Sequence, residues 1–329
     1  MTKTKNKSII YVVLALVMSL GLMFLGSACG ETTRTFTMEE GLTITLPSKF
    51  SQENEEYGYS FSSKEAIVDV TVWTKENLLW NGLVFDTTTP VEFATYMAVM
   101  DNLGQATNSG FVQTSSSGYA YYTNSQYSSE NGARIFLTYF VVKEKDKFFT
   151  LDMYCFESDR DKYRNTFHEW MQTAEYEHGT TANIEEKEFD FTDLKITLAN
   201  NFTDITESTD EQSFVVGSGY TFTFTKEVIT EDNQDTTLDQ YAQNDAGSAT
   251  VQKQDDLTFC EFSANLQNVS YKMATFYFKG EKNFYACSFY CPTSLYNQTK
   301  VIDFAKTIQI EPSSQEPPVI QPPVEEGTI

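Results

Sequence analysis

Two stretches of the chain begin with the same alternation of hydrophobic and polar residues. Residues 42–46 read LTITL, and residues 194–198, about 150 positions later, read LKITL. Side chains of a β-strand point alternately to opposite faces, so this period of two is typical of a strand with one buried face. The pattern predicts such a strand near the start of each of two similar units.

The similarity continues in the same order along both stretches. Each unit carries a capping box, the helix-start signal in which a threonine is followed three residues later by Glu or Gln. The matching pairs are Thr89-x-x-Glu92 with Thr237-x-x-Gln240, Thr74-Lys75-Glu76 with Thr225-Lys226-Glu227, Val112-Gln113 with Val251-Gln252, FFTLDMYC (148–155) with FYACSFYC (284–291), and Trp170-x-x-Thr173 with Phe304-x-x-Thr307. Matches in a fixed order predict a tandem duplication.

Each unit is expected to consist of strands interrupted by two helices, which favours an α+β fold over alternating βαβ units. In the first unit the expected strands are 42–46, 57–61, 67–74, 118–124, 134–143 and 148–155, and the expected helices are 90–102 and 159–174. The last three strands of the second unit are expected at 257–264, 271–279 and 284–291. We therefore expect two tandem homologous domains, each an antiparallel β-sheet packed with helices in the order β-β-β-α-β-β-β-α.

This order of elements resembles that of a known family. The pattern L-x-I-x-L-P-x-x-F at residues 42–50, and a final amphipathic helix after an aromatic strand, are similar to the PsbP-like α/β/α sandwich. That group includes the extrinsic subunit of the plant oxygen-evolving complex and small bacterial lipoproteins. The resemblance implies an antiparallel sheet with helices packed on it. It implies no activity, because one fold hosts unrelated functions.

The first 30 residues have the composition of an export signal. Lys3, Lys5 and Lys7 precede an apolar run from residue 9 to residue 25, and small residues follow that run. This basic, apolar, small-residue order is typical of a secretory signal, which is left out of fold reasoning. The alternative is an uncleaved membrane anchor, since the apolar run is close to the length of a membrane span.

The sequence Leu25-Gly26-Ser27-Ala28-Cys29 resembles the lipobox of bacterial lipoproteins. The resemblance implies that residues 1–28 are removed and that Cys29 is lipidated and becomes the new N-terminus. Two or more acyl chains are enough for stable anchoring to a membrane. The expected partner is therefore membrane lipid, bound through acylated Cys29, and the expected location is the extracytoplasmic face of a cell membrane. A composition rich in tyrosine, lysine and asparagine favours a Gram-positive host.

The expected organisation of the chain follows from these signals. Residues 1–28 are the lipoprotein signal peptide, 29–35 a tether, 36–177 the first repeat, 178–188 a polar linker, 189–311 the second repeat and 312–329 a disordered tail rich in proline and glutamate. Proline-rich acidic segments cannot form a packed core.

Charge excludes one class of partner. The signal holds three of the 23 basic residues and none of the 46 acidic ones, so the formal charge of the mature chain is −26. Such a surface repels nucleic acid, and we expect no nucleic-acid partner. Aromatic residues make up 15% of the chain and apolar residues 40%, which favours a packed core over disorder.

The four cysteines after Cys29 are too few for a disulfide framework. Cys155 and Cys291 share a strand face with apolar residues, so we expect small buried hydrophobic side chains. Cys260 and Cys287 have no cysteine counterparts in the first unit and lie on strands expected to be adjacent. One alternative is a disulfide between Cys260 and Cys287, and the other is two free buried thiols.

No residue pattern predicts a catalytic, cofactor or metal site. His168 lies within an expected helix and His178 in the linker, and we expect both to be structural or surface residues. Zinc-site patterns such as C-x-x-C and H-E-x-x-H are missing from the sequence. The acidic run at 231–235 lacks the glycine and late glutamate of a calcium-binding loop, so a solvated turn is expected.

Two functions from different classes fit these observations. The first is a non-catalytic binding or scaffolding module of the cell envelope, with an envelope protein or glycan as partner. The second is a solute-capturing lipoprotein or a hydrolase, with its site in one domain or in the cleft between the domains. Tyr119, Tyr121, Tyr122, Trp73 and Trp80 are aromatic residues that could stack on a partner if exposed, whereas strand tyrosines are more often half-buried.

Overall fold

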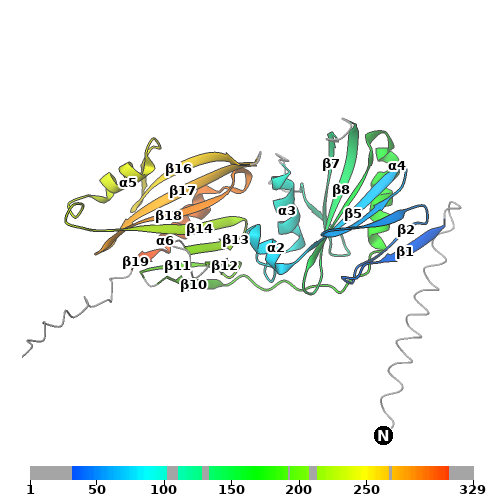
Figure 1. Ribbon diagram of the computed structural model, residues 1–329, viewed down its shortest axis with the longest axis horizontal. Helices are drawn as coiled ribbons and strands as arrows, with labels where there is room; N and C mark the ends of the chain where they lie inside the picture. The colour runs from blue at the N-terminus through cyan, green and yellow to red at the C-terminus, as the bar shows by residue number, and fades with distance from the viewer. Residues whose placement is uncertain are drawn as a thin grey trace, which may run out of the picture.

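The computed structural model describes residues 32–101, 110–127, 133–191, 193–206, 213–266 and 269–310. The signal peptide, Cys29 and the predicted tail therefore lie outside the described residues. Within the described part, the chain folds into two domains that lie side by side (Figure 1). Domain 1 runs from strand β1 to helix α4, and domain 2 runs from strand β10 to strand β19.

The main feature of each domain is a seven-stranded antiparallel sheet. The strand orders are β3-β4-β5-β9-β8-β7-β6 and β12-β13-β14-β18-β17-β16-β15, so the two sheets have the same topology. The strands of domain 1 are β3 (Ser51–Glu55), β4 (Gly58–Ser62), β5 (Ala66–Trp73), β6 (Gln113–Thr114), β7 (Ala120–Tyr127), β8 (Arg134–Lys143) and β9 (Phe148–Phe156). Those of domain 2 are β12 (Phe202–Asp204), β13 (Ser213–Gly217), β14 (Tyr220–Val228), β15 (Gln252–Gln254), β16 (Leu257–Leu266), β17 (Val269–Lys279) and β18 (Asn283–Pro292).

A smaller sheet accompanies each large one. In domain 1, β1 (Thr33–Thr37) pairs with β2 (Thr43–Pro47). In domain 2, β10 (Glu186–Asp190) pairs with β11 (Leu194–Ala199), which also pairs with β19 (Gln309–Ile310). The small sheets carry the LTITL and LKITL patterns, and Ile44 and Ile196 are both fully buried.

Helices cover the two faces of each large sheet. They are α2 (Lys75–Trp80), α3 (Pro90–Met100) and α4 (Arg160–Gln172) in domain 1, and α5 (Leu238–Ala246) and α6 (Gln298–Lys306) in domain 2, with short 3-10 turns η1 (Glu157–Asp159) and η2 (Thr293–Leu295). Figure 1 shows α3 and α4 on opposite sides of the domain 1 strands. Both capping boxes form, with Thr89 Oγ1 accepting from the Glu92 N–H and Thr237 Oγ1 from the Gln240 N–H.

Each domain consequently has two hydrophobic cores, one on each face of its sheet. In domain 1, α4 and the small sheet cover one face, and α2 and α3 cover the other. In domain 2, α6 and the small sheet cover one face, and α5 covers the other. Strand β9 contributes Phe149 and Leu151 to one core and Phe148 to the opposite core, because successive side chains alternate.

The predicted antiparallel sheets are confirmed. Strands make up a larger share of each domain, relative to helices, than the α+β expectation implied. Every strand expected from the sequence is present, with ends shifted by a few residues. The short edge strands β3, β6, β12 and β15 were not predicted, since they are mostly polar. Helix α2 was also not predicted; its six residues fall between predicted elements. The last three residues of the predicted linker, 186–188, belong to β10.

One predicted match is out of register. Thr74 is the N-cap of helix α2, whereas Thr225 lies within strand β14. Strand pairing instead aligns Thr225, opposite Ala286, with Thr71, opposite Thr150. The two TKE triplets are therefore a coincidence of sequence, and the other matched segments occupy equivalent positions.

The same threonine bridge ties the last helix to the small sheet in both domains. Thr173 Oγ1 accepts from the Thr45 N–H (2.9 Å) and donates to the Trp170 carbonyl (2.7 Å). Thr307 Oγ1 likewise accepts from the Thr197 N–H (3.2 Å) and donates to the Phe304 carbonyl (2.8 Å). The threonine of the repeated aromatic-x-x-Thr pattern thus joins the last helix of each domain to the small sheet.

We expect Thr173→Val and Thr307→Val each to lower the free energy of unfolding by about 1–2 kcal/mol, because each leaves a backbone N–H of the small sheet without its partner. Urea denaturation followed by tryptophan and tyrosine fluorescence measures this loss. Thr166→Val is the control, since Thr166 Oγ1 donates only to the Lys162 carbonyl of its own helix at the surface. Equal effects of all three substitutions would contradict a special role for the bridge.

Candidate functional site

The two domains meet through a pair of glycine turns. The Gly219 N–H donates to the Gly82 carbonyl across the boundary (2.9 Å), and both glycines have positive φ, +74° and +70°. A Cβ at Gly219 would lie 2.8 Å from the Leu295 side chain. Leu295 itself packs against cores of both domains. Because glycine alone adopts this backbone without strain, these turns allow the domains to approach closely.

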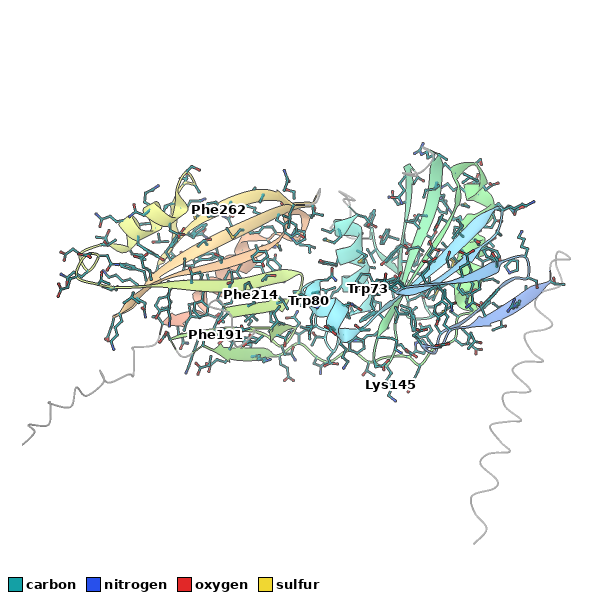
Figure 2. The ribbon with its side chains drawn as sticks, in the orientation of Figure 1. Trp73, Trp80, Lys145, Phe191, Phe214 and Phe262 are labelled. Atoms are coloured by element: carbon teal, nitrogen blue, oxygen red, sulfur yellow. The ribbon has the colours of Figure 1, made fainter. Side chains whose placement is uncertain are left out.

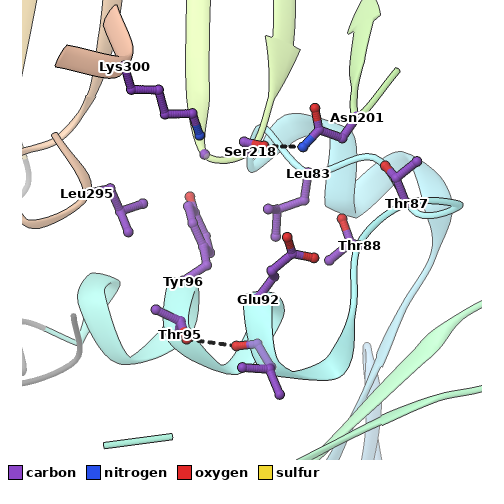
Figure 3. Close-up of a pocket in the computed structure, with 12 residues that line it drawn as sticks. Leu83, Thr87, Thr88, Glu92, Thr95, Tyr96, Asn201, Ser218, Leu295 and Lys300 are labelled. Carbon is purple, nitrogen blue, oxygen red and sulfur yellow. Dashed lines mark hydrogen bonds between the residues drawn. The ribbon is translucent and has the colours of Figure 1, made fainter. Parts of the chain in front are cut away.

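A pocket of about 240 Å³ lies beside this contact and is lined by both domains (Figure 3). Domain 1 contributes α3 and the loop before it, and domain 2 contributes two turns and the start of α6. The lining residues are Leu83, Thr87, Thr88, Val91, Glu92, Thr95 and Tyr96 from domain 1, and Asn201, Ser218, Gly219, Leu295 and Lys300 from domain 2. This volume is below the roughly 300–1,000 Å³ of ordinary ligand pockets, which favours a very small solute over a large ligand.

A buried lysine holds the domain 1 wall in place. Lys143, only 5% exposed, donates from Nζ to the Phe85 (2.8 Å) and Thr88 (3.0 Å) carbonyls of the α2–α3 loop. Burial lowers the pKa of Lys143 to about 8. The equivalent Lys279 of domain 2 donates to the Thr236 carbonyl (2.8 Å) before α5. This lysine is therefore a structural feature of both repeats rather than part of the pocket chemistry.

Most hydroxyl groups of the pocket are already used within the protein. Thr88 Oγ1 donates to the Val84 carbonyl (2.7 Å), Thr95 Oγ1 to the Val91 carbonyl (2.8 Å), and the Asn201 amide to Ser218 Oγ. These bonds fix the walls and leave few groups available for a ligand.

Three polar groups keep capacity for a ligand. Asn201 Oδ1 is buried and has no hydrogen-bond partner. Glu92 uses only Oε2 in the capping box, for the Thr89 N–H and hydroxyl. Lys300 Nζ stacks over the rings of Tyr220 (4.9 Å) and Phe304 (5.5 Å), and none of the ion pairs found among the described residues includes it. Figure 3 shows Lys300 and Glu92 reaching toward the pocket from different domains.

Electrostatics divide the pocket into a cationic and an anionic side. Burial lowers the pKa of Lys300, and the nearby Cys291 and Glu92 partly oppose this shift. Lys300 is the cation that can bind an anionic group, and Asn201 Oδ1 and Glu92 can accept hydrogen bonds. The lining residues include no cysteine or histidine.

The disulfide considered for Cys260 and Cys287 is not formed. Both cysteines are free and fully buried. Cys260 lies in the core under α5, and Cys287 lies in the core under α6, so the two thiols point to opposite faces of one sheet. Strand β17 also separates their strands. Cys155 and Cys291 are buried hydrophobic residues, as expected, and burial raises the pKa of Cys155 to about 11.

We expect Cys155, Cys260, Cys287 and Cys291 to be unreactive toward a thiol reagent in the native protein and all four to react after unfolding without reductant. The reason is that buried thiols with raised pKa values are neither accessible nor ionised. Absorbance with Ellman's reagent measures this. Reaction of only two of these thiols after unfolding would show that a disulfide had formed.

Most of the histidine and aromatic side chains considered from the sequence as candidate functional residues have structural roles. His168 packs against Tyr119, Tyr121 and Phe140, and burial lowers the pKa of His168. His178 forms a β-bridge with Glu144.

Trp73 and Trp80 differ in their surroundings. Trp73 packs edge-on against Phe93 and donates to Thr150 Oγ1, whereas Trp80 is 74% exposed on α2 (Figure 2). Of these two tryptophans, therefore, only Trp80 is exposed enough to contact a partner.

The described residues contain neither a metal-ligand cluster nor a membrane-spanning helix. No group of three or more His, Cys, Asp or Glu side chains among them is arranged to hold a metal ion. No helix in the described part of the chain is long and apolar enough to cross a membrane. The acidic run 231–235 forms turns before α5, as expected.

Sequence reasoning missed the pocket residues Asn201, Lys300 and Tyr96. Glu92 was identified only as a capping residue. No local signal marks these residues, because a lysine in the first turns of a helix and an asparagine in a turn are common on any surface. They become a site only when the glycine turns bring the domains together.

Comparison with known proteins gives no family. No family model matches the chain, and no curated protein matches its sequence. Solved structures with some likeness include a Bacteroides thetaiotaomicron protein with 10% identity and a TM-score of 0.31, covering 38% of this chain and 47% of that one. The chain thus spans about half the length of that protein.

Two further likenesses are to a cyanobacterial protein and to a bacterial immunity protein. The cyanobacterial PsbP protein of Synechocystis sp. PCC 6803 has 13% identity and a TM-score of 0.28, covering 46% of this chain and 98% of that one. The T6SS immunity protein TplEi of Pseudomonas aeruginosa has 11% identity and a TM-score of 0.19, covering 88% and 99%. At TM-scores this low, these likenesses carry no argument about function.

Proposed function

We propose that this protein is a lipid-anchored, extracytoplasmic, non-catalytic binding protein that holds a small polar solute between its two domains. The observation that carries the proposal is the pocket to which both domains contribute polar groups that can still bind a ligand: Lys300 and Asn201 Oδ1 from domain 2 and Glu92 Oε1 from domain 1. Asn201 Oδ1 is buried without a partner, which is unfavourable, and a ligand that pairs with it relieves that cost. Lys300 and Glu92 are exposed side chains that a ligand can meet directly.

The chemistry of these groups defines the solute. Lys300 matches an anionic group such as a carboxylate, and Glu92 and Asn201 match an ammonium or amide donor. Leu83, Val91 and Leu295 provide apolar contact. A free amino acid or a similarly small zwitterion has all of these features, and its size suits a pocket of about 240 Å³.

The anchoring part of the proposal is supported by the sequence. The export-type composition of residues 1–30 and the lipobox-like residues before Cys29 favour lipidation of Cys29 and a position on the extracytoplasmic face of a cell membrane. The finer assignment of each domain to the PsbP-like sandwiches is likewise proposed from the order of strands and helices. Capture of solutes near the membrane fits a protein tethered at that surface.

We expect Lys300→Met to weaken solute binding at least tenfold, which corresponds to about 1.4 kcal/mol, because the substitution removes the cation and keeps the apolar stem. Isothermal titration calorimetry on the detergent-solubilised full chain measures this, using the tightest binder from a panel of the standard free amino acids. Native mass spectrometry of the purified protein identifies any solute that copurifies.

Lys306→Met is the matched control, since Lys306 lies on the same helix and pairs with Asp255 outside the pocket. This variant should bind the solute as the wild type does. Failure of every amino acid to bind, or equal affinity of the Lys300→Met variant, would contradict the proposed ligand class.

Solute affinity should also fall with rising pH. The ammonium of Lys300 binds the anionic group. Desolvation beside the protein lowers the pKa of Lys300 from the ordinary 10.5, so the charge is lost earlier in the alkaline range than on a fully solvated lysine. Calorimetry from pH 7 upward follows this loss. Lys300→Arg should retain affinity to higher pH, because a guanidinium stays protonated. A wild-type affinity that is constant up to the ordinary lysine pKa would contradict the role of Lys300.

A further inference from the structure

One row of side chains across the large sheet differs in kind between the two domains. In domain 1 the residues directly opposite one another on β4, β5, β9, β8 and β7 are Ser60, Asp69, Asp152, Tyr139 and Tyr122. The equivalent residues of domain 2 are Phe214, Thr223, Ser288, Thr275 and Cys260. Domain 2 thus shows that the fold forms without charged side chains in this row.

The two aspartates of domain 1 oppose each other on neighbouring strands. Asp69 pairs with Asp152 in the β5–β9 register, which places their Cβ atoms about 5 Å apart. Like charges in directly opposite positions destabilise a sheet. None of the ion pairs among the described residues includes Asp69, Asp152 or the nearby Asp101, so no basic side chain of the described chain offsets this repulsion.

The two carboxyl groups have different surroundings. Asp69 accepts hydrogen bonds from Ser60 Oγ (2.6 Å) and Tyr154 Oη (2.7 Å). Asp152 Oδ1 is buried and has no hydrogen-bond partner. The Tyr139 ring beside it is 3% exposed, and Tyr122 Oη donates to Asp101 (2.9 Å). An unpaired carboxyl oxygen of Asp152 therefore lies next to a carboxyl group that two hydrogen bonds hold in place.

The row is open on one side. Tyr122 and Tyr139 belong to the core under α3, whereas Asp69, Asp152 and Tyr154 are only half-buried. Phe156, two residues beyond Tyr154 on the same face, is 48% exposed. The two aspartates thus keep partial exposure on the part of the sheet face that α3 does not cover, although Asp152 Oδ1 itself is buried.

We propose that Asp69 and Asp152 form a binding site for an organic ammonium group, separate from the interdomain pocket. An ammonium has three N–H donors and one positive charge, which satisfy Asp152 Oδ1 and neutralise the repulsion between the carboxylates. The tyrosine rings of the row suit the attached apolar stem and the cation. A metal ion fits less well, because no group of three or more His, Cys, Asp or Glu side chains among the described residues is arranged to hold one.

Binding at this site displaces a proton. Burial, with Asp69 and Asp101 adding to it, raises the pKa of Asp152 to about 8 from an ordinary 3.8. The facing titratable groups are Asp69, Asp101, Tyr122, Tyr139 and Tyr154. Without a ligand, Asp152 therefore holds a proton at pH 6.5, and an incoming ammonium releases that proton to solvent.

This protonation has a defined effect on stability. The folded state binds one more proton than the unfolded state between pH 3.8 and about 8, so stability contributed by Asp152 falls as pH rises through this window. A bound ammonium offsets this loss of stability, because its positive charge takes the place of the proton on Asp152.

The test uses N-acetyl-lysine amide and n-butylamine as probes on the detergent-solubilised full chain, with N-acetyl-norleucine amide as the neutral control. Calorimetry at pH 6.5 in buffers of different ionisation enthalpy should show binding of the amines with release of close to one proton. Binding of both probes indicates a free amine as the natural source, and binding of the lysine derivative alone indicates a peptide. Binding of neither, or equal binding of the norleucine control, overturns the proposal.

The second domain supplies the matched variant. Asp69→Thr with Asp152→Ser installs the residues of domain 2, so it should fold and lose at least tenfold in amine affinity and all proton release. Asp239→Asn, which removes an exposed acid of α5 that pairs with Lys253, should change neither. Unchanged amine affinity in the double variant, with its native circular dichroism retained, overturns the site.

Discussion

The structure depends on burial of both faces of the central strands. Strands β9 and β18 lie in the middle of seven-stranded sheets, and their side chains alternate between two cores. A sheet of this kind cannot leave either face in water, so each domain needs helices on one face and helix plus small sheet on the other. The placement of α3, α4, α5 and α6 follows from this requirement, as does the aromatic content of the strands.

The polar contacts that recur in both domains hold these layers together. Thr173 and Thr307 join the last helix to the small sheet with equivalent hydrogen bonds. Lys143 and Lys279 bind the carbonyls of the loop before the first long helix. Because a buried donor or acceptor must be paired, a feature repeated at equivalent positions reflects the needs of the fold. Features found in one domain alone are better candidates for function.

Two such features stand out against the repeated framework. The pocket between the domains collects Glu92 from one copy and Asn201 and Lys300 from the other, so it exists only because the copies are joined. The Asp69–Asp152 pair replaces neutral residues of the second copy and leaves a buried oxygen unpaired. In both features, polar groups lack the pairing that the rest of the structure provides, and such departures are typical of functional positions.

The sequence by itself determined the duplication, the central strands, the capped helices and the antiparallel sheets, because these arise from local periodicity and from patterns repeated in one order. It did not determine the short polar edge strands or the brief helix α2, whose residues carry no periodic signal. Cys260 and Cys287 lie on opposite faces, a matter of strand register that sequence spacing alone left open. The pocket and the aspartate pair were decided by tertiary structure, since they join residues that are distant in the chain. Their positions depend on strand order and on the contact between Gly82 and Gly219, neither of which has a local signature.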